Sequence, residues 1–144
     1  MALHALAYPG STPPLEPPNL GSADERKRLS SAGLRAFFNI MKRWDVRDVD
    51  ARALLGGVTN GPYYELKRSP TRVLDVDRLT RVSLLVGIFK ALHVLYSESL
   101  ADRWIQMPNS NRLFGGGTPL DYMREGGLPA MLTVRRLLDA RRAG

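Results

Sequence analysis

The chain has 144 residues, 44% of them hydrophobic, which suits one globular domain or two very small ones. Its formal net charge of +7 favours an anionic partner such as nucleic acid, and the absence of cysteine excludes disulfides, a thiol nucleophile and thiolate metal sites. Only two histidines occur, no uncharged apolar run could cross a bilayer, and the first ten residues do not read as a secretion signal. We therefore expect a cytoplasmic protein without metal, cofactor or membrane contact.

Residues 1–25 are rich in proline, which removes backbone donors and favours an extended, solvated chain. This segment is predicted to be a flexible tail, with docking to a partner as the alternative. The next segment, 29–44, is predicted to be an amphipathic helix because its large apolar residues recur at helical spacing. These residues are Leu34, Phe37, Phe38, Met41 and Trp44.

Residues 48–69 predict two short helices joined by a glycine turn. Gly56-Gly57 would end the first helix, because glycine accepts the left-handed conformation found at helix termini. Thr59 or Asn60 would cap the second, with Pro62 in its first turn. The spacing resembles a helix-turn-helix, although Tyr63 stands where a smaller apolar residue is usual.

Residues 75–97 predict the strongest helix, with Asp75 or Asp77 at its start. Two apolar stripes run along it, so the helix is either central to the fold or shared with a second subunit. For a homodimer, the predicted interface residues are Val82, Leu85, Phe89 and Leu92.

Three more helices are predicted, over 97–107, from about 119 to 126, and over 128–142. Because no segment shows sustained β alternation, the predicted fold class is all-α. The signals that bound these helices are Ser97 or Ser99 with Pro108 for the first, Thr118, Pro119 and Asp121 for the start of the second, and Gly126-Gly127 for its end.

The glycine run at 115–117 does not predict a phosphate-binding loop. A Walker loop needs a lysine after the glycines and a strand before them, and neither is present. The run is more simply a tight connection into a capped helix. His93 is expected to be packed or partly solvated, and no carboxylates are paired for acid–base chemistry, so we do not expect an enzyme.

Basic residues concentrate around the predicted helix-turn-helix. From Arg26 to Arg72 there are eleven lysines and arginines against four acidic residues, an excess that favours contact with DNA phosphates. The alternative is a solvated basic face. The predicted DNA-binding residues are Thr59, Asn60, Tyr63, Tyr64, Lys67 and Arg68.

The segment RWIQMPNSNRLFGGGTPLDYMREGGLPAMLTVRRLLDA resembles the toxin-binding domain of the Xre/MbcA/ParS family of bacterial antitoxins. Its third glycine, Gly117, goes beyond the usual pair. Upstream, ARALLGGVTNGPYYELKR resembles the divergent helix-turn-helix of that family, and the resemblance covers about residues 30–142. The residues that carry it in the C-terminal part are Trp104, Pro108-Asn109, Phe114-Gly115-Gly116, Thr118 to Asp121 and Gly126-Gly127.

The resemblance implies a RES-domain toxin as partner, which consumes NAD or ADP-ribosylates a target, and an antitoxin that occludes its active site. It also implies operator DNA as a second partner, repression of its own operon, and homodimers in a larger complex. We expect the glycines to leave the backbone and Phe114 open to the toxin, where Phe114 and Trp104 are the kind of large apolar side chains that anchor interfaces. The alternative is that both lie in the core, which is the expectation for Trp104. The C-terminal arginines either enter the NAD cleft or form a solvated helix end. The implied toxin-binding residues are Trp104, Asn109, Phe114, Gly115, Gly116, Arg135, Arg136, Arg141 and Arg142.

The predicted organisation is a tail (1–25), a helix-turn-helix-like DNA-binding unit (26–74) and a toxin-binding and dimerisation unit (75–144), joined by the long central helix. A stand-alone transcriptional regulator, whose C-terminal unit serves dimerisation or ligand sensing, is the alternative function. An enzyme with an unrecognised site is a weaker one.

Overall fold

The computed structural model describes residues 21–144, and the regular structure of these residues is entirely helical, without a β-strand. This confirms the all-α prediction. Most of the predicted tail, residues 1–20, lies outside the described residues. In the described part, the α-helices are α1 (Ala23–Arg43), α2 (Asp48–Leu54), α3 (Asn60–Arg68), α4 (Val76–Leu95), α5 (Glu98–Arg103) and α6 (Pro119–Ala143), with 3-10 turns at Trp104–Gln106 and Arg112–Phe114.

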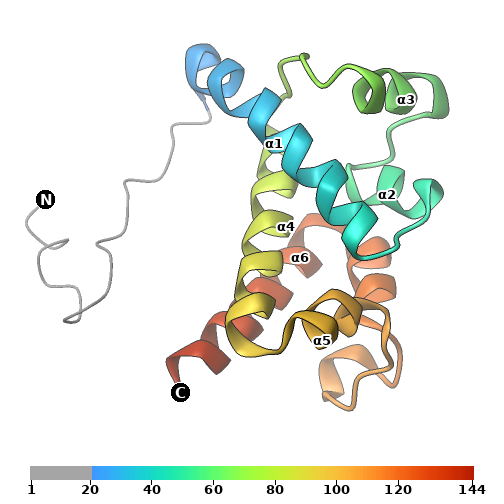
Figure 1. Ribbon diagram of the computed structural model, residues 1–144, viewed down its shortest axis with the longest axis vertical. Helices are drawn as coiled ribbons and strands as arrows, with labels where there is room; N and C mark the ends of the chain where they lie inside the picture. Colours follow the sequence, from blue (N-terminus) through green and yellow to red (C-terminus); the bar gives the residue numbers. More distant parts are fainter. Residues whose placement is uncertain (1–20) are drawn as a thin grey trace, which may run out of the picture.

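Helix α4 runs through the middle of the fold, with α1 and α6 packed against it (Figure 1). Gly33 of α1 lies directly on α4, because a Cβ atom there would come within 3.2 Å of Val82 Cγ1. Gly87 of α4 faces α6, where the guanidinium group of Arg135 fills the space that a side chain at Gly87 would need. Most of the apolar surface of α4 is therefore covered by helices of the same chain, whereas Val76 and Val94 near its two ends are exposed.

This burial corrects the predicted dimer interface. Val82, Leu85 and Leu92 are at most 1% exposed within the single chain, so they offer no side-chain surface to a second subunit. Phe89 is half-buried, with its ring centroid 6.2 Å from that of Trp44. A homodimer would therefore have to use a surface other than these three residues.

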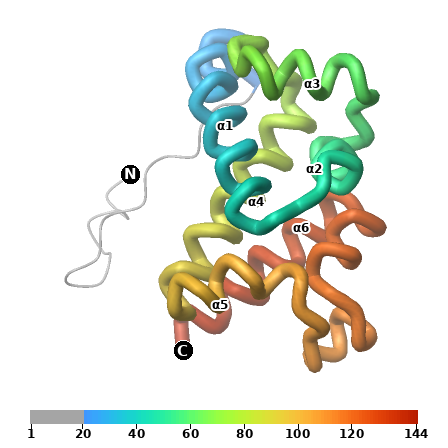
Figure 2. The backbone as a smooth tube through the Cα atoms, turned by 45° about the vertical axis from the view of Figure 1, so that its right-hand side comes forward, coloured from blue at the N-terminus to red at the C-terminus, as the bar shows by residue number. Residues whose placement is uncertain are grey.

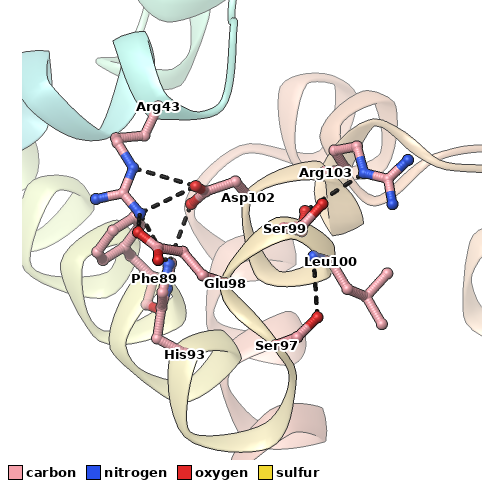
Figure 3. A network of polar contacts seen from close by, with 9 residues as sticks. All are labelled: Arg43, Phe89, His93, Ser97, Glu98, Ser99, Leu100, Asp102 and Arg103. Carbon is pink, nitrogen blue, oxygen red and sulfur yellow. Dashed lines mark hydrogen bonds and ion pairs between the residues drawn. The ribbon is translucent and has the colours of Figure 1, made fainter.

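A polar network holds the C-terminal end of α1 against α4 and α5 (Figure 3). Arg43 donates to Oδ2 of Asp102 from Nε at 3.1 Å and from Nη2 at 2.9 Å, and to Glu98 Oε1 at 3.1 Å. His93 Nε2 lies 3.1 Å from Oδ1 of the same aspartate. One arginine thus connects three helices, and His93 is one of its packed neighbours.

Side chains cap the helices where the sequence predicts their starts. Asp75, Ser97 and Thr118 accept hydrogen bonds from the backbone N–H three residues ahead, at 2.8, 3.5 and 3.1 Å. These contacts confirm the predicted starts of α4, α5 and α6. Ser22 caps α1 in the same way, so this helix begins at Ala23, earlier than the predicted position 29.

The predicted glycine turn between α2 and α3 is also confirmed. Gly56 and Gly57 have φ angles of +95° and +85°, in the left-handed region that glycine adopts without strain. The N–H of Gly57 donates to the carbonyl of Arg52 at 2.9 Å, which closes the end of α2. Figure 2 shows α2 and α3 following α1 at one side of the fold, and α3 contacts α1 through the rings of Tyr63 and Phe38.

The predicted N- and C-terminal units share one hydrophobic cluster, which runs from Leu34 to Leu138. An ion pair also joins them, because Arg124 Nη1 of α6 donates at 3.0 Å to Oδ1 of Asp50 in α2, a residue that is only 5% exposed. Because the carboxylate of Asp50 is buried and accepts this hydrogen bond, the contact links α2 directly to α6.

Helix α6 is broken at Gly127, whose φ of 67° and ψ of −148° are not helical. Sequence analysis placed a helix end at this position and a new helix after it, and the break confirms that boundary. The second half of α6 turns back across α4 (Figure 2). The conformation of Gly127 belongs to a region that side chains exclude almost completely.

We expect Gly127→Ala to lower the free energy of unfolding by about 1–3 kcal/mol, because alanine is strained at this φ and ψ. Urea unfolding of the full chain measures the effect. Gly61→Ala is the matched control, since Gly61 is helical, has open space around it and should change stability by less than about 1 kcal/mol. Equal stabilities of the two variants would contradict the expectation.

Candidate functional site

The loop from Met107 to Thr118 is closed by its own hydrogen bonds. The N–H of Asn109 donates to the carbonyl of Gly117 at 3.0 Å, across the base of the loop. The Asn109 side chain accepts from the N–H of Asn111, and the Asn111 side chain from the N–H of Leu113, both at 2.9 Å. These Asn turns give the loop a defined shape without an external ligand.

The glycines make the sharp return of this loop possible and leave its tip uncovered. Gly115 and Gly116 have φ angles of +56° and +85°, and a Cβ atom at either would meet nothing within 4 Å. Both residues are exposed. Gly117 closes the turn, with its N–H donating to the carbonyl of Phe114 at 2.9 Å. The loop therefore presents bare backbone outward.

Three aromatic rings, one of which belongs to the loop, pack together and join the loop to the core. The rings of Trp104 and Phe114 meet edge to face with centroids 6.0 Å apart, and those of Phe114 and Tyr122 at 5.4 Å. Trp104 is 6% exposed, as expected for a core residue. The expectation that Phe114 is open to a partner is wrong for its side chain, which is 7% exposed, because the ring anchors the loop to the core.

The predicted C-terminal arginines lie in different environments. Arg135 pairs with Asp139, with Nε 3.0 Å from Oδ2, and packs against Gly87 of α4. Within residues 21–144, Arg136 and Arg142 are exposed and have no polar partner. Only Arg141 comes to the loop, so the structure brings together Trp104, Asn109 and Arg141 and leaves the other arginines apart.

These three residues line a pocket of about 250 Å³ with Met107, Pro108 and Ser110. Arg141 Nη1 donates to the hydroxyl of Tyr96 at 3.0 Å. Met107 is 40% exposed beside the pocket. Neither Met107 nor Tyr96 is predicted to belong to this site, because only the return of α6 past α4 brings them near Arg141.

The second predicted surface lies on α3, where Asp48 of α2 collects three donors. It accepts from the hydroxyl of Tyr63 at 3.0 Å, from that of Tyr64 at 2.8 Å and from Lys67 Nζ at 2.9 Å. Tyr63 is 1% exposed, so the prediction that it reads DNA is wrong, because its ring belongs to the core. Tyr64 and Lys67 remain exposed.

The other predicted residues of this surface are also exposed. Thr59 occupies the N-cap position of α3 without a side-chain cap bond, and Asn60 follows it. Arg68 pairs with Glu65 one turn earlier, with Nη2 2.7 Å from Oε1. The structure therefore gathers five of the six predicted DNA-binding residues on the outside of α3, and gives both cations a carboxylate partner.

The groups around Asp48 change the pKa of its carboxyl group. The hydrogen bonds from Lys67 and Tyr64 hold the pKa of Asp48 below its ordinary value. The same carboxylate raises the pKa of Tyr64, whereas burial, followed by the Asp48 contact, raises the pKa of Tyr63. Asp48 is therefore ionised at neutral pH and joins α2 to α3.

No group of histidine, aspartate and glutamate side chains among residues 21–144 is arranged to hold a metal ion. In the same part of the chain, no helix has the length and apolar character needed to cross a membrane.

Comparison with known proteins points to the first of the two surfaces. The antitoxin Xre/MbcA/ParS C-terminal toxin-binding domain matches residues 90–144, which include the loop, the pocket and α6. The chain is also 37% identical over 114 residues to the uncharacterized protein y4oB of Sinorhizobium fredii (strain NBRC 101917 / NGR234). That similarity covers 78% of this chain and 86% of the relative.

The lowered pKa of Asp48 predicts how its contribution to stability depends on pH. A carboxylate with a depressed pKa stabilises the fold above its unfolded pKa of about 3.9, and this stabilisation is lost as the pH falls through the folded pKa. Asp48→Asn keeps an acceptor for Tyr63 but removes the charge. We expect the variant to be less stable than the wild type at about pH 7, and the difference to shrink below about pH 4.

Urea unfolding at several pH values measures this difference. A destabilisation that stays constant as the solution is acidified would contradict the prediction.

Proposed function

Because the chain belongs to the Xre/MbcA/ParS family of antitoxins, we propose that it binds a RES-domain toxin and blocks the active site of that toxin. The observation that carries this proposal is the match over residues 90–144, which contains the whole loop and α6. The proposed mechanism is stoichiometric occlusion: the antitoxin covers the NAD-dependent site of the toxin and performs no reaction of its own.

The shape of the loop supports its use as a docking surface. Its internal hydrogen bonds and its aromatic base fix the backbone before a partner arrives, so that little ordering entropy is lost on binding. The bare backbone of Gly115 and Gly116 permits close approach by another protein. Arg136 and Arg142 lie apart from the loop, on the last turns of α6, where they are exposed and offer positive charge that suits an anion-binding cleft.

We also propose that α3 contacts operator DNA, so that the antitoxin, alone or with its toxin, represses its own operon. Thr59, Asn60 and Tyr64 are exposed and suited to polar contacts with DNA, and Lys67 and Arg68 are suited to phosphates. Both cations already pair with carboxylates, Lys67 with Asp48 and Arg68 with Glu65. DNA would have to compete for them, which favours modest, salt-sensitive binding.

Toxin binding is tested by placing a side chain on the bare loop. We expect Gly116→Asn to weaken affinity for the proposed toxin, tested as the product of the flanking gene, by about tenfold or more, because the new side chain separates the loop from its partner. Isothermal titration calorimetry measures the affinity. Asparagine tolerates left-handed backbone better than other side chains, so the fold should survive.

Gly57→Asn is the matched control, since Gly57 has the same φ of +85° and equally open surroundings but lies in the α2–α3 turn. It should bind toxin as the wild type does and restore growth to cells that express the toxin. If the wild type neither binds this protein nor restores growth, the antitoxin proposal fails. DNA binding in that case would favour a stand-alone regulator.

DNA binding is tested with the double variant Lys67→Ala and Arg68→Ala on a duplex from the region upstream of the gene. We expect weaker binding and a shallower dependence on salt. The slope of log K against the logarithm of the salt concentration should fall in magnitude by about two, because each phosphate contact contributes about one to this slope. The control is Lys90→Ala with Arg103→Ala, which removes two exposed cations from α4 and α5. Equal losses in both double variants would indicate a non-specific charge effect.

A further inference from the structure

The pocket beside the loop is rich in donors and has no acidic residue among its lining residues, Trp104, Met107, Pro108, Asn109, Ser110 and Arg141. The carbonyl end of the Asn109 side chain accepts from Asn111, which leaves its NH₂ group without a partner in residues 21–144. Ser110 adds a hydroxyl group, and Arg141 adds a guanidinium group. A ligand for this pocket must therefore bring acceptors.

A hydrogen bond orients Arg141, and no carboxylate in residues 21–144 neutralises its charge. Its Nη1 donates to the neutral hydroxyl of Tyr96 at 3.0 Å, and it has no carboxylate partner within the described residues. Most arginines with a polar partner in this part of the chain pair with acids, as Arg43 does with Glu98 and Asp102. The remaining N–H groups of Arg141 keep the planar fork that matches a carboxylate.

The size and walls of the pocket suit a single side chain. About 250 Å³ is below the range of about 300–1,000 Å³ found for small-molecule sites. Trp104 and Met107 supply the apolar part of its wall, against which the carbon atoms of such a side chain can pack. The pocket also lies within the stretch 90–144 that matches a toxin-binding domain.

From these contacts we infer that the pocket receives an aspartate or glutamate side chain of the toxin, which pairs with Arg141. This inference rests on the proposed function, because the partner is the toxin. In this arrangement a toxin side chain enters a pocket of the antitoxin and binds Arg141, whereas one sequence-based expectation is that Arg141 enters the NAD cleft of the toxin. Tyr96 is a positioning residue, which orients the guanidinium fork through its hydroxyl group.

The experiment measures the affinity of full-length variants for the proposed toxin, tested as the product of the flanking gene, at low and at physiological ionic strength. We expect Arg141→Gln to weaken binding by about tenfold and to reduce its dependence on salt, because a charge pair has been lost. Arg35→Gln, which changes an exposed arginine of α1 without a partner, should match the wild type. Thermal melting checks that each variant is folded.

Tyr96→Phe separates positioning from charge. It removes only the hydroxyl group, so affinity should fall less than in Arg141→Gln while the salt dependence of the wild type is retained. Arg141→Lys should recover the salt dependence but not the full affinity, because an ammonium group lacks the fork.

Each other outcome has a definite meaning. If the wild type binds the toxin and Arg141→Gln binds equally well, the pocket inference is overturned and the antitoxin function stands. If Arg141→Gln binds more weakly with unchanged salt dependence, the pocket does not take a carboxylate. If Arg141→Gln instead weakens binding to DNA alone, the pocket serves a phosphate and the inference fails. If the wild type binds no toxin, the proposed function itself fails, and this inference with it.

Discussion

The fold depends on the burial of α4 between α1 and α6. A helix that is apolar on two sides cannot remain exposed in water, and the small residues Gly33 and Gly87 let its neighbours approach closely on both sides. Because α1 precedes the helix-turn-helix and α6 follows the loop, covering α4 also assembles the two candidate surfaces. The same burial removes Val82, Leu85 and Leu92 from any interface between subunits.

The two surfaces consequently belong to one body. They share a hydrophobic cluster, and the Asp50–Arg124 pair fastens α2 to α6 directly. Arg43 adds a second connection, from the end of α1 to α4 and α5 (Figure 3). An antitoxin built in this way carries its proposed toxin-binding loop and its proposed DNA-binding helix as fixed features, and the positions of both are set by the same core.

The two surfaces differ in whether their basic side chains pair with carboxylates. On α3, each candidate cation is already paired, Lys67 with Asp48 and Arg68 with Glu65, so an anionic partner must replace a carboxylate. Beside the loop, Arg141 is oriented by the neutral Tyr96 and keeps its charge available. A net charge of +7 alone would favour nucleic acid, but the paired cations of α3 and the unpaired Arg141 make the loop the surface better prepared for an acidic group.

The sequence by itself determined what depends on neighbours a few residues apart. The caps at Asp75, Ser97 and Thr118, the glycine turn after α2 and the break at Gly127 follow from local backbone preferences, and they fixed the helical class and most boundaries. Only the tertiary structure decided which aromatic rings are covered and which charges meet. Phe114 is buried between Trp104 and Tyr122, which belong to the elements on either side of its loop, and Tyr63 is buried against Phe38 of α1. Arg141 reaches a loop more than twenty residues earlier because α6 returns past that loop. Helical spacing specifies the side of a helix on which a residue lies, but the partner on that side is set by packing.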